Sequence, residues 1–235
     1  MKVFVFTCDK YLKAVPPFAY LFNKYWGEDQ EVIIVGYAKP GFDLPRNFTY
    51  LSLGAQENYP FSRWSDSVIR VTDLFPAEEV FCLMLEDYWI CQPVRRDVVR
   101  KLYDYMRQFS YVLKMDLVGD RRFAGGATEY GCVDDIKLVK SDFNSQYHSS
   151  LMTGLWNRAL MRRYLLIPNE SPHDVELRGT PRLARIGDDI LVLGTEIDPW
   201  PVKHILAFRG QNIDNLLLEG LSDEDRAELT ERNLI

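Results

Sequence analysis

The stretch that decides the fold is Val80-Phe81-Cys82-Leu83-Met84-Leu85, which runs directly into Glu86-Asp87-Tyr88-Trp89. An apolar run of this length without alternation predicts a strand buried on both faces, as in the centre of a parallel sheet. Placing two adjacent carboxylates at the border of a core costs folding free energy unless a positive group pairs with them. Ligands of open α/β sheets bind at the carboxyl ends of the strands, and carboxylate oxygens suit Mg²⁺ or Mn²⁺.

Glu86 and Asp87 are therefore candidate ligand-binding residues, and Asp87 is a candidate metal ligand. The alternative is a strand-end turn whose acids lie in water or pair with Arg95 or Arg96.

Strand and helix patterns alternate on both sides of this stretch. Strands are expected over residues 2–7, 31–37, 48–53, 80–85 and 111–115, and helices over 16–26, 62–75 and 94–109. This order predicts an α/β fold with a mostly parallel sheet, right-handed crossovers and helices on both faces.

Beyond Asp120 the pattern changes to one typical of antiparallel strands. Residues 121–140 predict antiparallel strands or a hairpin around Gly125-Gly126, which adds a small antiparallel part in the C-terminal half. Further helices are expected over 156–165 and 172–185, a strand over 189–193, and a closing acidic helix over 222–233.

Length and composition favour one domain. The chain has 235 residues and is 47% hydrophobic, which is enough for a sizeable core. It has no apolar run of the roughly 18–20 residues that span a bilayer, no signal peptide, and four cysteines without metal spacing. We therefore expect a cytoplasmic protein with free thiols and no transmembrane segment.

Charge is distributed unevenly along the chain. Seven acidic and two basic residues lie between Asp214 and Ile235, so most of the net charge of −6 is at the end. A second feature is a run of arginines, for which a solvated helix surface and a phosphate-binding face are both open. Its members are Arg158, Arg162, Arg163, Arg178, Arg182 and Arg185.

Two further positions could bind a nucleotide. Thr7 and Asp9 follow the first strand, at the same edge of the sheet as Glu86, and could hold a base and ribose; a turn-forming Asp9 is the alternative. Arg63, Trp64 and Ser65 begin an expected helix, whose N–H groups and guanidinium suit a pyrophosphate. Ordinary core packing is the alternative for Trp64.

Several short motifs together resemble one family. They are TCDKY at 7–11, FSRWSDS at 61–67, LEDYW at 85–89, SSLMTGLWNRALM at 149–161, SPHDVELRG at 171–179, and a late His204. In this order they resemble the small GT-A-type glycosyltransferases of phages and bacterial surface-polysaccharide clusters, which use nucleotide-sugars.

The resemblance implies a GT-A-like fold in which residues 1–120 bind the donor nucleotide, 121–213 form the acceptor side, and 214–235 are a closing helix. It places the donor diphosphate and Mg²⁺ or Mn²⁺ on Glu86 and Asp87, with His204 as a late metal ligand and UDP as the commonest nucleotide. The chain has Glu-Asp-Tyr where the family has Asp-x-Asp.

The resemblance also implies a catalytic base and an acceptor site. The base of an inverting reaction would be Asp174 or Glu176, and His148, Ser149 and Trp156 would line the acceptor site. The residues themselves offer a structural reason for Asp174. Ser171 as N-cap, Pro172 as N1 and Asp174 as N3 predict a near capping box.

The function expected from these features is transfer of a sugar from a nucleoside-diphosphate sugar to an acceptor hydroxyl. The acceptor would be a hydroxymethylated base in phage DNA or a bacterial surface glycan. The alternatives are a non-catalytic binding module and a nucleotidyltransferase acting on sugar phosphates. A nucleotidyltransferase would usually carry a glycine-rich phosphate loop and a basic residue after strand one, and Cys8-Asp9-Lys10-Tyr11 lacks the glycines.

Overall fold

The computed structural model describes residues 1–119, 121, 124–196, 200–210 and 212–235. By its internal contacts the chain divides into two compact units, each assembled from separated stretches. We call residues 2–56, 84–94 and 202–235 the β1 unit, and Met1 with residues 57–83 and 95–201 the hairpin unit. The division of the chain near residue 120 that the resemblance implies stays a prediction.

The β1 unit contains three parallel strands, β1 (Val3–Phe6), β2 (Val32–Gly36) and β3 (Phe48–Ser52), with Val32 opposite both Val3 and Phe48. Helix α1 (Val15–Tyr25) begins with a proline pair, as expected, because proline is tolerated in a first turn. Phe22 of α1 is fully buried and packs edge-to-face on Phe48, with ring centroids 5.6 Å apart. The predicted strands and helix of this stretch are confirmed to within about two residues.

The rest of the β1 unit comes from two later stretches. Strand β5 (Tyr88–Ile90) pairs antiparallel with β11 (His204–Leu206), and β12 (Phe208–Arg209) pairs with β13 (Asn212–Ile213). The expected closing helix is α7 (Asp223–Glu231). The β5–β11 pair is absent from the elements expected from sequence.

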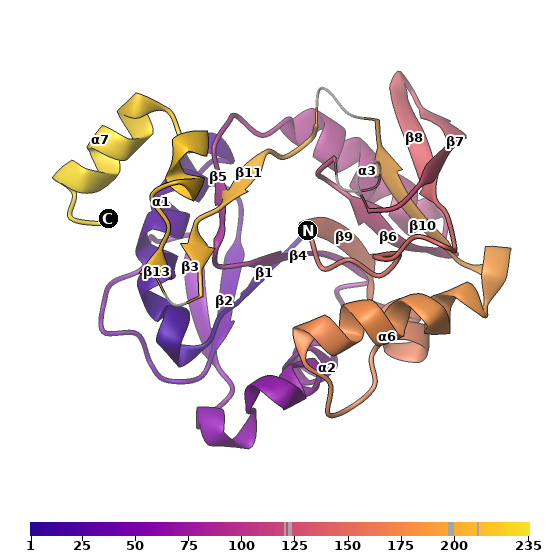
Figure 1. Ribbon diagram of the computed structural model, residues 1–235, viewed down its shortest axis with the longest axis horizontal. Coiled ribbons are helices and arrows are strands. Elements are labelled where there is room, and N and C mark those ends of the chain that lie inside the picture. Colours follow the sequence, from indigo (N-terminus) through magenta and orange to yellow (C-terminus); the bar gives the residue numbers. More distant parts are fainter. Residues whose placement is uncertain (120, 122–123, 197–199, 211) are drawn as a thin grey trace. The chain divides into compact units, whose positions relative to one another are not determined.

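The hairpin unit holds a mixed set of strands in the order β4-β9-β6-β10-β8-β7. They are β4 (Val80–Leu85, whose last two residues lie in the β1 unit), β9 (Gly154–Asn157), β6 (Val112–Asp116), β10 (Leu191–Thr195), β8 (Ile136–Ser141) and β7 (Ala127–Val133). Strands β6 and β10 run parallel, and the pairs that involve β7, β8 and β9 are antiparallel. Its described α-helices are α2 (Trp64–Leu74), α3 (Arg96–Gln108), α5 (Arg158–Leu160) and α6 (Pro172–Ala184), and a π-helical segment (Met161–Leu165) continues α5 (Figure 1).

The predicted α/β class, with helices flanking a Rossmann-like sheet and antiparallel strands added by the C-terminal half, is confirmed. No helix in the described ranges is both long and apolar enough to cross a membrane.

Three local expectations are wrong. Strand β4 pairs antiparallel with β9, so its unbroken apolar run reflects burial of both faces rather than two parallel neighbours. The expected antiparallel strands form as β7 and β8, but their hairpin turns at Asp134-Asp135, where Asp134 adopts a φ of 52°, and not around Gly125-Gly126. Trp156 lies in a strand, because pairing with β4 and β6 overrides the helical pattern that begins there. Residues 120, 122 and 123 of the expected hairpin region lie outside the described residues.

Polar contacts join helix α7 to α1, and the two helices lie close together in Figure 1. The fully buried carboxylate of Asp225 accepts hydrogen bonds from the Tyr25 hydroxyl at 2.7 Å and from Ser222 at 2.8 Å, and lies 3.0 Å from the Lys24 ammonium. Lys24 also donates to Glu228 at 2.6 Å. Burial alone would raise the pKa of Asp225, but the hydrogen bonds from Tyr25, Lys24 and Ser222 outweigh it and hold the pKa below its usual value.

We expect Asp225→Asn to lower the free energy of unfolding by about 2–3 kcal/mol near neutral pH, because a buried carboxylate with charge-assisted hydrogen bonds is lost. A lowered folded-state pKa stabilises the protein above the unfolded pKa of about 3.9, and the effect disappears as pH falls through the folded value. Urea unfolding at pH 7 and in acid should therefore show the two proteins converging only below about pH 4. Asp223→Asn, whose side chain is 96% exposed, is the control. An equal loss in both variants, or a loss that persists in acid, would contradict this account.

Candidate functional site

The acidic turn that follows β4 is fixed from both sides. Glu86 and Asp87 lie between Leu85 at the end of β4 and Tyr88 at the start of β5. The indole N–H of the fully buried Trp89 donates to the Glu86 carbonyl at 3.2 Å. The N–H of Ala207, next to β11, donates to the Asp87 carbonyl at 2.9 Å. The two carboxylates are therefore held at the strand end that the sequence predicted.

The two carboxylates differ in environment. Glu86 is only 7% exposed, and burial raises its pKa well above the usual range, with the charge of Asp87 raising it further. Burial also raises the pKa of Asp87, to about 6. The Oδ1 atom of Asp87 is buried and has no hydrogen-bond partner among the described residues. At neutral pH Asp87 is thus a carboxylate with one oxygen that no described residue binds, and burial shifts Glu86 toward its protonated form.

The end of β1 lies beside this turn. A side-chain hydrogen bond joins Thr7 to Glu86, and Thr7 donates its N–H to the Val35 carbonyl at 2.9 Å. Burial and then the charge of Glu86 raise the pKa of the Cys8 thiol to about 11. Lys10 lowers the pKa of both Glu86 and Cys8, so its positive charge acts on the same small region. Sequence reasoning missed Lys10, although a basic residue directly after the first strand was the signal that could have found it.

Asp9 acts as a turn former in this structure. Its Oδ1 accepts a hydrogen bond from the Ala38 N–H at 2.9 Å, and its own N–H donates to Gln56 at 2.8 Å. These contacts tie the loops after β1, β2 and β3 together. A nucleotide-binding role for Thr7 and Asp9 stays a prediction.

The expected metal site has only partial support. Among the described residues, no group of three or more His, Cys, Asp and Glu side chains is placed to hold a metal ion. The β5–β11 register sets His204 opposite Ile90, in the strand that follows the acidic turn. A metal site shared by Asp87 and His204 stays a prediction. Asp87 alone still fits Mg²⁺, which proteins often bind through one or two carboxylates while substrate phosphates supply other ligands.

In the hairpin unit, the start of α2 is occupied by structural contacts. Ser65 is fully buried; its hydroxyl donates to the Ile167 carbonyl at 2.7 Å and accepts from the Glu170 N–H at 3.0 Å. Arg63 pairs with Asp66 at 2.6 Å, one turn further along. Ser65 thus joins α2 to the segment before α6. The pyrophosphate role of Arg63, Trp64 and Ser65 stays a prediction.

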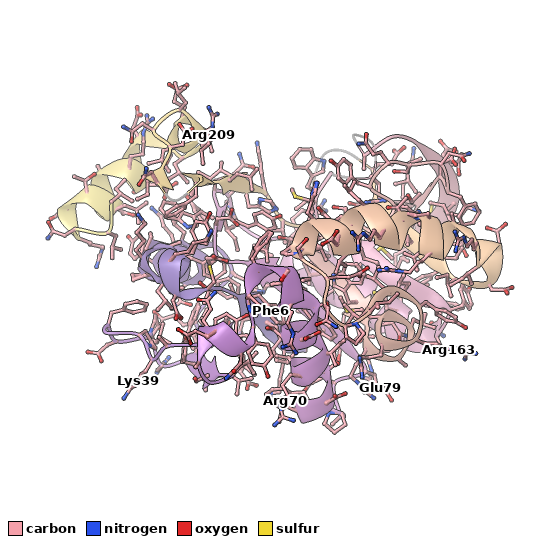
Figure 2. All side chains as sticks on the ribbon, turned by 60° about the horizontal axis from the view of Figure 1, so that its bottom comes forward. Phe6, Lys39, Arg70, Glu79, Arg163 and Arg209 are labelled. Carbon is pink, nitrogen blue, oxygen red and sulfur yellow. The ribbon has the colours of Figure 1, made fainter. Side chains whose placement is uncertain are left out.

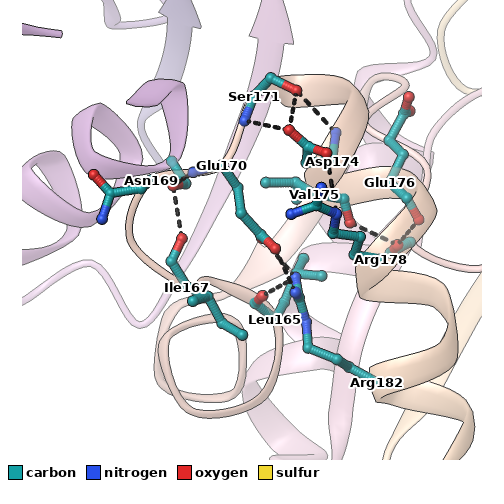
Figure 3. A network of polar contacts seen from close by, with 12 residues as sticks. Leu165, Ile167, Asn169, Glu170, Ser171, Asp174, Val175, Glu176, Arg178 and Arg182 are labelled. Carbon is teal, nitrogen blue, oxygen red and sulfur yellow. Dashed lines mark hydrogen bonds and ion pairs between the residues drawn. The ribbon is translucent and has the colours of Figure 1, made fainter. Parts of the chain in front are cut away.

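The start of α6 forms the predicted capping box (Figure 3). Ser171 accepts from the Asp174 N–H at 3.0 Å, while Asp174 accepts from the Ser171 N–H at 3.2 Å. The Ser171 hydroxyl also donates to the Asp174 carboxylate at 2.6 Å. This hydrogen bond, and then the one from the Ser171 N–H, lower the pKa of Asp174, which makes it a weaker proton acceptor. The carboxylate of Glu176 accepts from the Leu151 N–H at 2.7 Å. Both carboxylates therefore accept hydrogen bonds that stabilise the local structure. A catalytic role for either stays a prediction.

Several of the arginines in the run over 158–185 form ion pairs with carboxylates. Arg182 grips the nearly buried Glu170 with two nitrogens, at 2.6 and 2.8 Å, and donates to the Leu165 carbonyl (Figure 3). Arg178 lies 3.2 Å from Asp174. Arg163 is exposed and points outward in Figure 2. Some of these arginines thus form ion pairs within the protein and others are exposed to solvent, so they do not form a single unpaired basic face.

The residues expected to bind an acceptor surround a buried ionic cluster. Lys114 and Arg121 both pair with Asp116, and all three side chains are fully buried. Lys114 donates to the Ser150 carbonyl at 2.6 Å, and Arg121 donates to the Tyr147 carbonyl at 2.8 Å. The cluster therefore pins the loop over residues 145–151 onto the sheet face formed by β6 and its neighbours.

His148, Ser149 and Trp156 belong to this buried region, with at most 1% of each residue exposed. Burial, then the charges of Arg121 and Lys114, lower the pKa of His148 to about 4, so this histidine is neutral. Ser149 donates to the Glu176 carbonyl at 2.8 Å, and the Lys114 ammonium lies 5.0 Å from the Trp156 ring centre. An acceptor-binding role for these three residues stays a prediction.

Comparison with known proteins places the fold. No protein-family model matches the chain, and no curated protein matches it. An apo UDP-glucose pyrophosphorylase matches it with a TM-score of 0.50 at 10% identity, covering 99% of both chains. A CMP:2-keto-3-deoxy-manno-octonic acid synthetase complexed with CTP matches with a TM-score of 0.49 at 14% identity, covering 98% of both chains. A cytidylyltransferase from Leptospira borgpetersenii matches with a TM-score of 0.48 at 4% identity, covering 99% of this chain and 94% of the other. At these identities the likeness shows the fold alone.

The expected glycosyltransferase function is wrong on this finding. The likeness to a UDP-glucose pyrophosphorylase favours the nucleotidyltransferase that the sequence left as an alternative. Nothing in the comparisons supports a phage protein, a DNA acceptor or a glycan acceptor.

Proposed function

We propose that the chain is a nucleotidyltransferase that joins a nucleoside triphosphate to a phosphorylated sugar and releases pyrophosphate. The observation that carries this proposal is the carboxylate of Asp87 at the end of β4, half-buried and with one oxygen unused by the described residues. It stands beside the end of β1, in a fold similar to that of a UDP-glucose pyrophosphorylase. A strand-end carboxylate of this kind suits a reaction whose substrates are phosphates.

The proposed reaction is an attack at phosphorus. An oxygen of the sugar phosphate forms a bond to the α-phosphorus of the triphosphate, and the bond from that phosphorus to the bridging oxygen breaks. The leaving pyrophosphate takes the bonding electron pair. Positioning and charge neutralisation supply most of the rate enhancement in phosphoryl chemistry of this kind.

Asp87, Lys10 and Glu86 would have different roles in binding the phosphates, because their environments differ. Asp87 would hold Mg²⁺, and the bound ion supplies neutralisation of the phosphate charge. Lys10, exposed and in electrostatic reach of Glu86, attracts the triphosphate to the same edge. Burial raises the pKa of Glu86, which reduces the negative charge that would repel the phosphates.

The chain lacks a glycine-rich loop after β1, which is consistent with phosphate binding by side chains and a bound ion. Such a loop binds phosphate through backbone N–H groups. Here the residues after β1 are Cys8, Asp9, Lys10 and Tyr11, so side chains and the ion at Asp87 would carry the phosphate charge instead. The retained feature is the basic residue, Lys10.

The test is ligand-dependent stabilisation with a panel of nucleoside triphosphates, each with and without Mg²⁺. A ligand at about 100 times its Kd should add about 2.7 kcal/mol to the free energy of unfolding, which raises Tm by about 5–11 °C for a chain of this size. We expect one triphosphate to do this only with Mg²⁺. Failure of every triphosphate at millimolar concentration would contradict the proposal and favour the non-catalytic binding module.

A further inference from the structure

His204 has a position that differs from the one expected of a metal ligand. Its ring lies parallel to the ring of Tyr88, with centroids 4.6 Å apart and an interplanar angle of 7°. Stacking of this kind is an attractive arrangement of flat side chains. His204 is therefore packed on the residue that directly follows Asp87.

The strand register explains this contact. In an antiparallel pair, residues directly opposite share a face and successive residues alternate between faces. His204 lies opposite Ile90, and Tyr88, two residues before Ile90, is on the same face. Asp87 directly precedes Tyr88 in the turn that leads into β5. His204 can thus act on Asp87 through Tyr88.

The β5–β11 ribbon is so short that a single side-chain pair can contribute much of its stability. Strands β5 and β11 have three residues each, and an isolated two-stranded ribbon is at best marginally stable. Aromatic pairs across strands are a main source of stability in such ribbons. The same ribbon carries the backbone contacts that fix the turn, including the hydrogen bond from Ala207 to the Asp87 carbonyl.

We propose that His204 is a positioning residue, which fixes the Glu86-Asp87 turn for metal-bound nucleotide by stacking on Tyr88. The inference rests on the proposed function, because it concerns the same turn. It assigns His204 no bond to the ion or to the nucleotide. The imidazole nitrogens are then dispensable, and the flat ring is not.

Two substitutions separate a positioning role from a ligand role. His204→Phe keeps a flat ring and removes both nitrogens, whereas His204→Ala removes the ring. We would measure the Kd of the protein for UTP, CTP, GTP and ATP with Mn²⁺ by calorimetry, and the melting temperature without ligand. We expect His204→Phe to bind within about threefold of the wild type. His204→Ala should bind about 10–100-fold more weakly, the usual cost of losing a residue that orients a ligand group.

The outcomes are distinct. Equal loss of binding in the two variants would overturn the inference in favour of a metal ligand, and unchanged binding in His204→Ala would overturn it in favour of a spectator. Should His204→Ala fail to fold, His204→Leu takes its place, because it fills the space without a flat ring and the inference requires it to bind about 10–100-fold more weakly than His204→Phe. A wild-type protein that binds none of the four nucleotides with Mn²⁺ would overturn the proposed function and, with it, the inference.

Discussion

Replacing Asp116 by Asn is expected to lower the free energy of unfolding by about 3–5 kcal/mol, because it leaves two buried cations without their anion. Lys114 and Arg121 have fully buried side chains that both pair with Asp116. Asn has the same shape and can accept a hydrogen bond but carries no charge. At about 2–4 °C per kcal/mol, Tm should fall by about 6–20 °C in a thermal unfolding experiment.

The matched control for this substitution is Asp135→Asn. The Asp135 side chain is 83% exposed and lies 3.6 Å from Lys101. Exposed pairs contribute little, so the change should stay within about 0.5 kcal/mol. Similar melting temperatures for Asp116→Asn and Asp135→Asn would show that the cluster does not hold the loop over residues 145–151 in place.

Replacing Asp87 by Asn should have the opposite effect on the protein without ligand, raising the free energy of unfolding by about 1–3 kcal/mol at pH 7–8. Burial raises the folded pKa of Asp87 to about 6, whereas the unfolded value is about 3.9. The folded state therefore holds a proton that the unfolded state has lost, and stability rises as pH falls from above 6 towards 4. The difference between variant and wild type should vanish below about pH 4, where the carboxyl is protonated in both the folded and the unfolded state.

The same substitution should abolish stabilisation by Mg²⁺ with a nucleoside triphosphate. A residue kept at a cost to stability and needed for a ligand is typical of functional sites. Asp43→Asn, at an exposed carboxylate of the same unit, should change neither property. A less stable Asp87→Asn protein, or one that still gains Tm from Mg²⁺ and nucleotide, would contradict the assigned role.

Much of the fold was predictable because local patterns and tertiary structure agree. The apolar run at 80–85 is a strand, and its terminal acids lie where the sequence placed them. The capping box at Ser171 formed because its signal is contained within four residues. Such features depend on near neighbours, which a sequence displays directly.

The features that sequence reasoning missed depend on distant partners. Strand β5 pairs with β11, more than a hundred residues later, and three-residue strands carry no periodic signal of their own. Trp156 begins a helical pattern, yet its pairing with Phe81 and Lys114 makes it part of a strand. A stronger signal for the ionic cluster was present. Lys114 and Asp116 stand two residues apart in an apolar strand, so they share a face and could have been read as a buried pair.

The measurement that tests the central claim most directly is pyrophosphate release. The protein would be incubated with Mg²⁺, each nucleoside triphosphate and a set of sugar 1-phosphates, with Asp87→Asn as the control. We predict pyrophosphate and a nucleotide-sugar in equal amounts, formed only when both substrates are present and lost in Asp87→Asn. Release of a nucleoside diphosphate from a nucleotide-sugar, with no pyrophosphate from any substrate pair, would contradict the account.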